Sequence, residues 1–210
     1  MNRVLAAAGF LIGLAALILQ FAITIPASME AGRSFVLSLV FYFSFFTILT
    51  NIALVLIYAG ALFPARRLGV FRLPVTRAAA AAAITLVGTF YHFVLAPLWQ
   101  PEGLFLVCDV TLHYVAPILY LVWFVGFSRS GTLSLRMLPA MLAVPLVYVI
   151  YVMIRGALLG EYPYPVLEAN RLGYGPVALN IAGLIVIFTL LCAIAVALDR
   201  FRPHPSQPNG

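Results

Sequence analysis

The chain has 210 residues, of which 64% are hydrophobic and 9% are charged. Soluble domains carry about 25% charged residues, so this chain has too few polar side chains to face water on all sides. The net charge is +6, and every basic residue is an arginine, because the sequence contains no lysine. The lack of lysine excludes a retinal Schiff base. The arginines lie between apolar segments, where they set topology, so we expect no nucleic-acid partner.

Six apolar segments follow one another, and each has the roughly 20 residues that a helix needs to cross a bilayer. The sequence therefore predicts an all-α fold: one bundle of six transmembrane helices over residues 1–202. The second segment is the longest, so we expect its helix to tilt or to extend beyond the bilayer. A polar, proline-rich tail at 203–210 is expected to be disordered. The expected helices cover residues 4–25, 35–63, 78–98, 104–127, 138–158 and 176–198.

Arginines flank these segments unevenly. By the positive-inside rule, the side with more arginines faces the cytoplasm. The sequence thus predicts a multi-pass protein of the cell (plasma) membrane with both termini cytoplasmic. The opposite side carries Arg33 and Arg171 in loops, together with glutamates. The arginines assigned to the cytoplasmic side are Arg3, Arg66, Arg67, Arg72, Arg77, Arg129, Arg136, Arg200 and Arg202.

Four ionisable residues fall inside the expected helices, where such groups are costly unless paired or hydrated and are therefore functional candidates. With a helix rise of about 1.5 Å per residue, all of them lie in the outer half of the membrane. Each also has a structural interpretation, such as a hydrogen-bonded histidine or an arginine that pairs with the aspartate or reaches out to the interface. These residues are His92, Asp109, His113 and Arg155.

Asp109 and His113 are spaced i, i+4, which places them on one face of a helix. A carboxylate in that position can hold an imidazole in one tautomer. Pro117 follows one turn later and removes the N–H that the carbonyl of His113 would otherwise accept, so we expect a local kink. The spacing predicts a polar, locally opened site on this helix.

A proline- and tyrosine-rich loop covers residues 159–175 on the expected outer side. The prolines and glycines argue against a regular helix. Tyrosines suit the membrane interface, so the loop is either an interfacial anchor or a lid over an outward-facing site. Cys108 and Cys192 fall in different apolar segments and are expected to be small packing residues.

Two further stretches, FFTILTN around Thr47 and LHYVAPILY around His113, resemble the bacterial "Pr-six-Pr" membrane proteins. These proteins are similar to the androgen-induced and androgen-dependent membrane hydrolases. The segments YHFVLAPLW, RGALLGEYPYP and NRLGYGP fit the bacterial group best. The resemblance covers most of the six-helix chain, although Tyr114 follows the histidine where the eukaryotic hydrolases usually have threonine.

The resemblance implies a membrane-embedded hydrolase of fatty acyl esters without a cofactor, in which Thr47 and His113 are the catalytic pair. A threonine hydroxyl needs an adjacent base to become a nucleophile, and His113 would be that base with Asp109 as its orienting partner. Asn51, His92 and Arg155 are the predicted substrate-binding residues. The other expected partners are membrane lipids, and the oligomeric state is left open.

Two alternatives remain open from the sequence. The same polar groups would serve a non-enzymatic transporter, a lipid-binding protein or an assembly factor as a proton or carboxylate site. His92, Asp109 and His113 would also offer imidazole and carboxylate ligands to a metal or a haem, although no compact ligand motif is present and no metal site is predicted.

Overall fold

The computed structural model describes residues 2–128 and 130–200, and within them every regular element is a helix or a helical turn. The predicted tail at 203–210 and two of the arginines used for topology, Arg129 and Arg202, lie outside the described residues. The all-α class is therefore confirmed for the described part of the chain.

Five continuous helical segments are long and apolar enough to cross a membrane. The chain thus has the architecture of a polytopic membrane protein. The expectation of one long helix over 35–63 is wrong, because a bent pair with an angle of 74° takes its place: α2 (Phe35–Tyr42) and α3 (Phe46–Leu62). The continuous segments are Asn2–Glu30, Pro74–Leu98, Gly103–Ser128, Leu135–Leu159 and Tyr174–Arg200.

Several of these segments combine α-helix with other helical turns. The α-helices are α1 (Asn2–Glu30), α4 (Pro74–Phe90), α5 (Gly103–Val110), α6 (Ala116–Trp123), α7 (Leu138–Leu159), α8 (Ala169–Leu172) and α9 (Tyr174–Arg200). Wider π-helical turns cover Tyr91–Leu95, Thr111–Val115 and Phe124–Ser128. Tighter 3₁₀ turns cover Arg66–Leu68, Val70–Arg72, Ala96–Leu98, Leu135–Met137 and Pro165–Leu167.

Hydrogen bonds to tyrosines from distant parts of the chain stabilise the break between α2 and α3. Phe45 is extended, with φ −85° and ψ 124°. Where the helix unwinds, its backbone groups need other partners, because the surroundings are apolar. The hydroxyl of Tyr148 donates to the carbonyl of Ser44 at 2.8 Å, and the amide of Phe46 donates to the Tyr164 hydroxyl at 2.9 Å. These hydrogen bonds therefore lower the free-energy cost of unwinding the helix, compared with the same backbone exposed to lipid.

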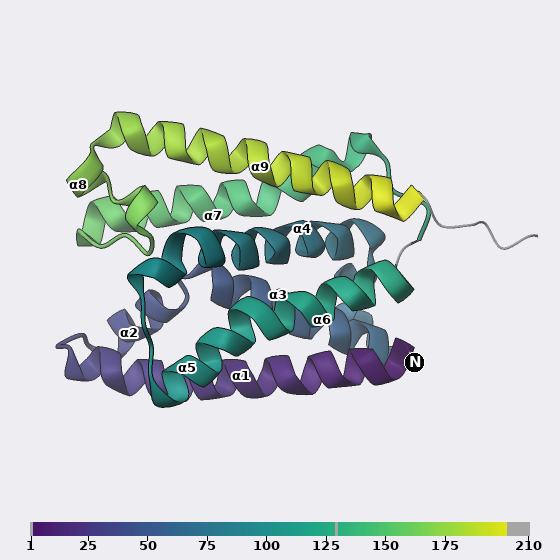
Figure 1. Cartoon of the computed structure of the whole chain (residues 1–210), viewed down its shortest axis with the longest axis horizontal. Helices are drawn as coiled ribbons and strands as arrows, with labels where there is room; N and C mark the ends of the chain where they lie inside the picture. The colour runs from purple at the N-terminus through teal and green to yellow at the C-terminus, as the bar shows by residue number, and fades with distance from the viewer. Residues whose placement is uncertain (1, 129, 201–210) are drawn as a thin grey trace, which may run out of the picture.

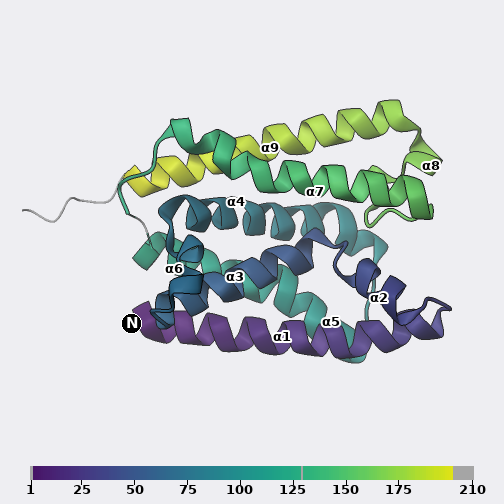
Figure 2. The same cartoon turned by 180° about the vertical axis from the view of Figure 1, so that it is seen from behind.

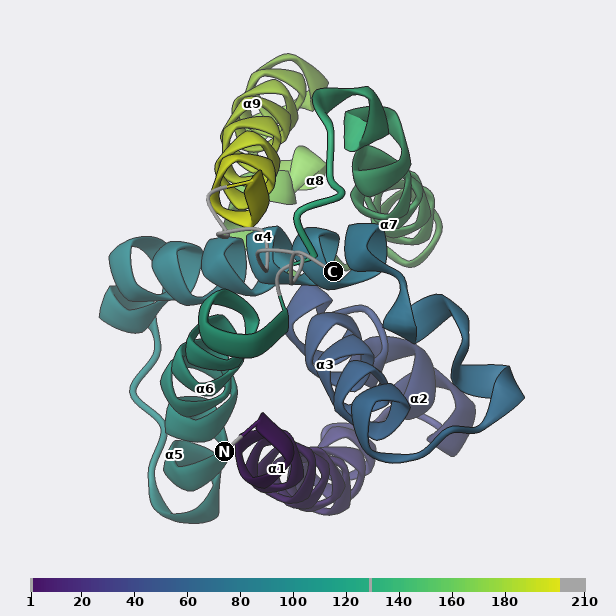
Figure 3. The same ribbon diagram turned by 90° about the vertical axis from the view of Figure 1, so that its right-hand side faces the viewer.

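The helices form two groups on either side of α4 (Figures 1 and 3). On one side α4 packs against α7 and α9, and on the other it packs against α3 and α6, with α1 lying along α3. Residue 2 and the last turn of α9 lie at the same end of the bundle, which we call the terminal end (Figures 1 and 2). The opposite end, the distal end, carries the α1–α2 turn, the α4–α5 connection and the loop at 160–168 before α8.

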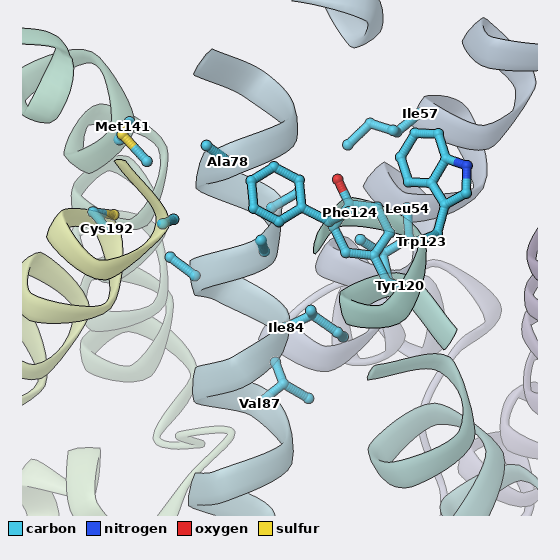
Figure 4. Packing of buried hydrophobic residues seen from close by; sticks show 14 of the residues in the cluster. Leu54, Ile57, Ala78, Ile84, Val87, Tyr120, Trp123, Phe124, Met141 and Cys192 are labelled. Atoms are coloured by element: carbon cyan, nitrogen blue, oxygen red, sulfur yellow. The ribbon is translucent and has the colours of Figure 1, made fainter. Parts of the chain in front are cut away.

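Aromatic rings fill the core toward the terminal end (Figure 4). Tyr58 lies edge-on to Tyr120 and to Trp123, with ring centroids 5.6 and 5.2 Å apart. Trp123 donates to the Asn2 side chain at 2.7 Å, and Tyr120 donates to the carbonyl of Arg77 at 2.9 Å. The buried Tyr58 hydroxyl has no hydrogen-bond partner among the described residues. This region is close-packed, whereas the space around Thr47 is not.

Candidate functional site

Thr47, His113 and Asp109 form a continuous chain of polar contacts in the distal half. The Thr47 Oγ1 atom lies 3.2 Å from His113 Nε2. On the other side of the ring, His113 Nδ1 lies 3.2 Å from Asp109 Oδ1 and 3.0 Å from the Asp109 carbonyl oxygen. Thr47 and Asp109 are each only 8% exposed. The residues that the sequence could not place relative to one another are thus within hydrogen-bond reach.

The partners of His113 decide its tautomer. Both oxygens beside Nδ1 belong to Asp109 and only accept hydrogen bonds when the carboxylate is ionised, so Nδ1 carries the proton. In the neutral ring, Nε2 is then an acceptor. The Thr47 hydroxyl therefore donates to Nε2, which is the direction that a base needs in order to take a proton from a nucleophile.

Tyr91 completes the group, and sequence reasoning missed it by selecting its neighbour His92. The Tyr91 ring stacks on the His113 ring with centroids 3.9 Å apart and 12° between the planes. Its hydroxyl donates to Asp109 Oδ2. Both carboxylate oxygens of Asp109 therefore have partners, and the imidazole is held on one face by an aromatic ring. The available signal was a tyrosine next to His92, an ionisable residue inside an expected membrane helix.

The break before α3 places Thr47 in the first turn of that helix. In a continuous helix over 35–63, Thr47 would instead have been roughly 18 Å from the outer end. At the start of a helix the helix dipole favours negative charge. The first amides of α3 are already engaged, because Phe46 donates to the Tyr164 hydroxyl and Ile48 donates to the Phe45 carbonyl. The helix dipole, rather than free amides, therefore favours negative charge on the Thr47 oxygen.

The π-helical turns bring Tyr91 and His113 together. They cover Tyr91–Leu95 and Thr111–Val115, and such turns are frequent at functional sites. Gly88 lets α4 approach closely, since a Cβ atom there would lie 3.2 Å from the carbonyl oxygen of His113. Pro117 leaves that carbonyl without its usual i+4 donor, as the sequence predicts.

Asn51 joins α3 to the π-helical turn that carries His113. Its side-chain amide donates to the carbonyl of Thr47 at 2.9 Å and to the carbonyl of Leu112 at 3.3 Å. Asn51 is 1% exposed, and its Oδ1 atom has no hydrogen-bond partner among the described residues. Its contacts fix the position of Thr47, whereas its predicted role in substrate binding stays a prediction.

Tyr164 brings the loop at 160–168 into the same site. Its hydroxyl accepts the amide of Phe46 and interacts with the side chain and the amide of Thr47. Burial raises the pKa of Tyr164, and the contacts with Thr47 and Phe46 act in the opposite direction. The net shift is upward, so the phenol is neutral near pH 7. The loop therefore forms part of the site.

A cavity of about 90 Å³ opens on the other side of Thr47, between α4, α7 and α9. Thr47, Tyr148 and Tyr164 contribute the hydroxyl groups of its lining, and the other lining residues are apolar. Thr47 thus lies between the imidazole of His113 on one side and the apolar cavity on the other. The apolar lining residues are Phe46, Leu86, Val87, Phe90, Leu95, Leu142, Pro145, Leu146, Val149, Val166, Leu167, Ile181, Leu184, Ile185 and Phe188.

The two remaining sequence candidates have other partners. Arg155 donates to the carbonyl of Glu161 at 2.8 Å and to its carboxylate at 3.3 Å, rather than pairing with Asp109. His92 is exposed, and its Nδ1 lies 3.1 Å from the hydroxyl of Tyr114. Neither residue joins the contacts around Thr47 that the structure describes, and their predicted role in substrate binding stays a prediction.

Among residues 2–128 and 130–200, no group of three or more His, Cys, Asp or Glu side chains could hold a metal ion. Cys108 and Cys192 are both buried and free. The chain matches no protein-family model, no curated protein and no solved structure. The function is therefore inferred from the geometry of the site.

Proposed function

We propose that this chain is a membrane-embedded hydrolase of fatty acyl esters, with Thr47 as nucleophile, His113 as general base and Asp109 as the group that orients His113. The observation that carries the proposal is the contact of Thr47 Oγ1 with His113 Nε2 at 3.2 Å, in the wall of an apolar cavity. Nucleophile, base and orienting group are each within or near hydrogen-bond reach of the next.

The reaction has two halves. Thr47 Oγ attacks the ester carbonyl while its proton moves to His113 Nε2, and the C–O bond to the alcohol then breaks as Nε2 returns the proton to the leaving oxygen. Water repeats the sequence on the acyl-threonine, which releases the acid and restores Thr47. Asp109 stays ionised and stabilises the imidazolium that forms in each half.

The surroundings favour a lipid ester over a water-soluble one. Apolar helices surround the site, and apolar side chains dominate the lining of the adjoining cavity. The transfer of an acyl chain from water to such an apolar wall is favourable in free energy, whereas a polar substrate would lose hydrogen bonds to water without compensation. The resemblance of short stretches to the "Pr-six-Pr" proteins and the membrane hydrolases points to the same substrate class.

Thr47→Ala and His113→Ala test the proposal directly. We expect each variant to lose at least about 10³-fold in the hydrolysis of a p-nitrophenyl acyl ester by purified protein in detergent. We also expect a fluorophosphonate probe to label wild-type protein on Thr47, located by mass spectrometry, and to label neither variant.

Thr85→Ala is the matched control, because the Thr85 hydroxyl donates to its own helix backbone at 2.8 Å. It should keep wild-type turnover. If wild-type protein takes no label and cleaves no acyl ester, the proposal fails. Binding of the ester without turnover would instead support a lipid-binding protein, which the apolar cavity also suits.

We also propose that both termini face the cytoplasm and that the protein resides in the plasma membrane. Most described arginines outside the helix interiors lie at the terminal end, including Arg66, Arg67 and Arg136. The positive-inside rule then places the site in the outer half of the membrane. Cysteines introduced one at a time at 31–34 and at 66–72 should react with a membrane-impermeant maleimide only at the former in intact cells.

A further inference from the structure

The lining of the cavity beside Thr47 extends along the bundle axis. On α7 its lining runs from Leu142 to Val149, and on α9 it runs from Ile181 to Phe188. With a rise of about 1.5 Å per residue, each stretch spans roughly 10 Å along the bundle axis. Because the two helices run in opposite directions, Leu142 and Phe188 lie together at the end nearer the termini. Thr47 lies at the distal end of this space.

The distal end of the cavity is the polar one. Tyr148 contacts the break before α3, and Tyr164 contacts the first turn of α3. The opposite end has no hydroxyl in its lining and stops at Phe188, which is 2% exposed and belongs to the close-packed core. Behind Phe188 on α9 lie Cys192 and Val196, which are at most 1% exposed, so little space continues past it.

From this shape we propose that the cavity holds the acyl chain of the ester, with the carbonyl at Thr47 and the methyl end at Phe188. Phe188 is then the residue that sets the longest chain accepted, a specificity-determining role. This inference rests on the proposed hydrolase function, since it assigns the cavity to that reaction's acyl group. The chain would lie between α4, α7 and α9, on the side of Thr47 opposite to His113.

The physical basis is the fit of one chain in an apolar space that ends at Phe188. Interiors are close-packed, so a chain longer than the cavity must displace side chains, and a shorter chain leaves part of the wall without contacts. One methylene too many or too few in an apolar pocket changes kcat/KM by roughly tenfold or more. A sharp dependence on chain length is therefore expected.

Two substitutions should move this dependence in opposite directions. Phe188→Ala removes the end wall, so the preferred acyl chain should lengthen by several carbons. Ile185→Phe, one turn nearer Thr47 on the same helix, fills the cavity and should shorten it. The measurement is kcat/KM for p-nitrophenyl esters of even-numbered acyl chains, with the expected crossover at least tenfold between long and short esters.

Phe93→Ala is the matched control, since Phe93 is 76% exposed and does not line the cavity. It should keep the wild-type profile. A short-chain fluorophosphonate that still labels Thr47 shows that a variant retains its nucleophile. Unchanged chain-length profiles in Phe188→Ala and Ile185→Phe, with Thr47 still reactive, would overturn the cavity assignment while leaving the hydrolase function in place.

A photoreactive fatty acid with a terminal diazirine tests the same assignment without turnover. Adducts on Leu142, Ile185 or Phe188, reduced in Ile185→Phe, would support the cavity even if wild-type protein cleaved no ester. Adducts confined to lipid-facing residues such as Phe93 would overturn it. Failure of the hydrolase function and failure of the cavity assignment are therefore distinguishable.

Discussion

Each end of the bundle buries one aspartate, and the two carboxylates have different kinds of partner. Asp199 at the terminal end is 1% exposed and accepts the amides of Ser130 and Leu133 at 2.5 and 3.1 Å, as well as the Ser130 hydroxyl. Asp109 in the distal half is bound instead by the side chains of His113 and Tyr91. Neither a backbone amide nor a serine hydroxyl gains a charge near neutral pH, whereas an imidazole can.

The surroundings differ in the same way. Around the terminal end, aromatic rings fill the core, as Figure 4 shows for Tyr120 with Trp123, which is tilted against it, and Phe124, which stacks on it. In the distal half the backbone is broken before Thr47, and an apolar cavity adjoins it. The terminal carboxylate therefore fastens a loop, and we propose that the distal carboxylate serves the site around Thr47.

Replacing each aspartate by asparagine should give the largest contrast. Asp109→Asn should lower kcat by between about 10² and 10⁴-fold, because the uncharged amide no longer stabilises the imidazolium. Its thermal unfolding should change little. If ester hydrolysis by Asp109→Asn stays within twofold of wild type, Asp109 is structural and the contrast between the two ends disappears.

Asp199→Asn should act on stability instead. Hydrogen bonds to a charged group are stronger than those to a neutral one, so we expect a loss of about 2 kcal/mol in the free energy of unfolding. Turnover per folded molecule should not change. Differential scanning fluorimetry in detergent and esterase assays on the same preparation measure both quantities. A selective loss of turnover would contradict a purely structural role.

Tyr148→Phe sharpens the contrast within the distal half. It removes the hydrogen bond to the carbonyl of Ser44 and should cost about 1 kcal/mol in stability. Because that bond helps to hold the break before Thr47, kcat should fall about tenfold, whereas a buried core change at the terminal end should lower stability alone. Paired kcat and unfolding measurements on Tyr148→Phe and Ile57→Val make this comparison.

The smallest effect is expected at the distal surface. Glu161 is bound by Arg33 at 3.0 Å and by Arg155 at 3.3 Å, and its own side chain is 45% exposed. Water screens the Glu161 carboxylate, and the buried Arg155 keeps its hydrogen bond to the Glu161 carbonyl at 2.8 Å, so Glu161→Gln should lower stability by only about 1 kcal/mol. A larger loss of activity than of stability would show that this ion pair, which ties 31–34 to the loop at 160–168, also positions Tyr164.

The local features of this protein follow from its sequence. Apolar segments of about 20 residues predict membrane-spanning helices, because the rise per residue gives a helix of that length the thickness of the hydrocarbon core. The i, i+4 spacing of Asp109 and His113, and the missing donor at Pro117, are likewise properties of one helix. The structure confirms the contact between Asp109 and His113 and five apolar helical segments long enough to cross a membrane, whereas the segment at 35–63 is bent.

Only the tertiary structure decided where the second segment breaks and what Thr47 faces. The break is held by Tyr148 and Tyr164, which lie 104 and 118 residues away from their partners in the sequence. The stacking of Tyr91 on His113 and the cavity between α4, α7 and α9 likewise join distant segments. The physical reason is that an unwound backbone in an apolar bundle is stable only where other segments supply its hydrogen bonds, and no local pattern shows which segments will do so.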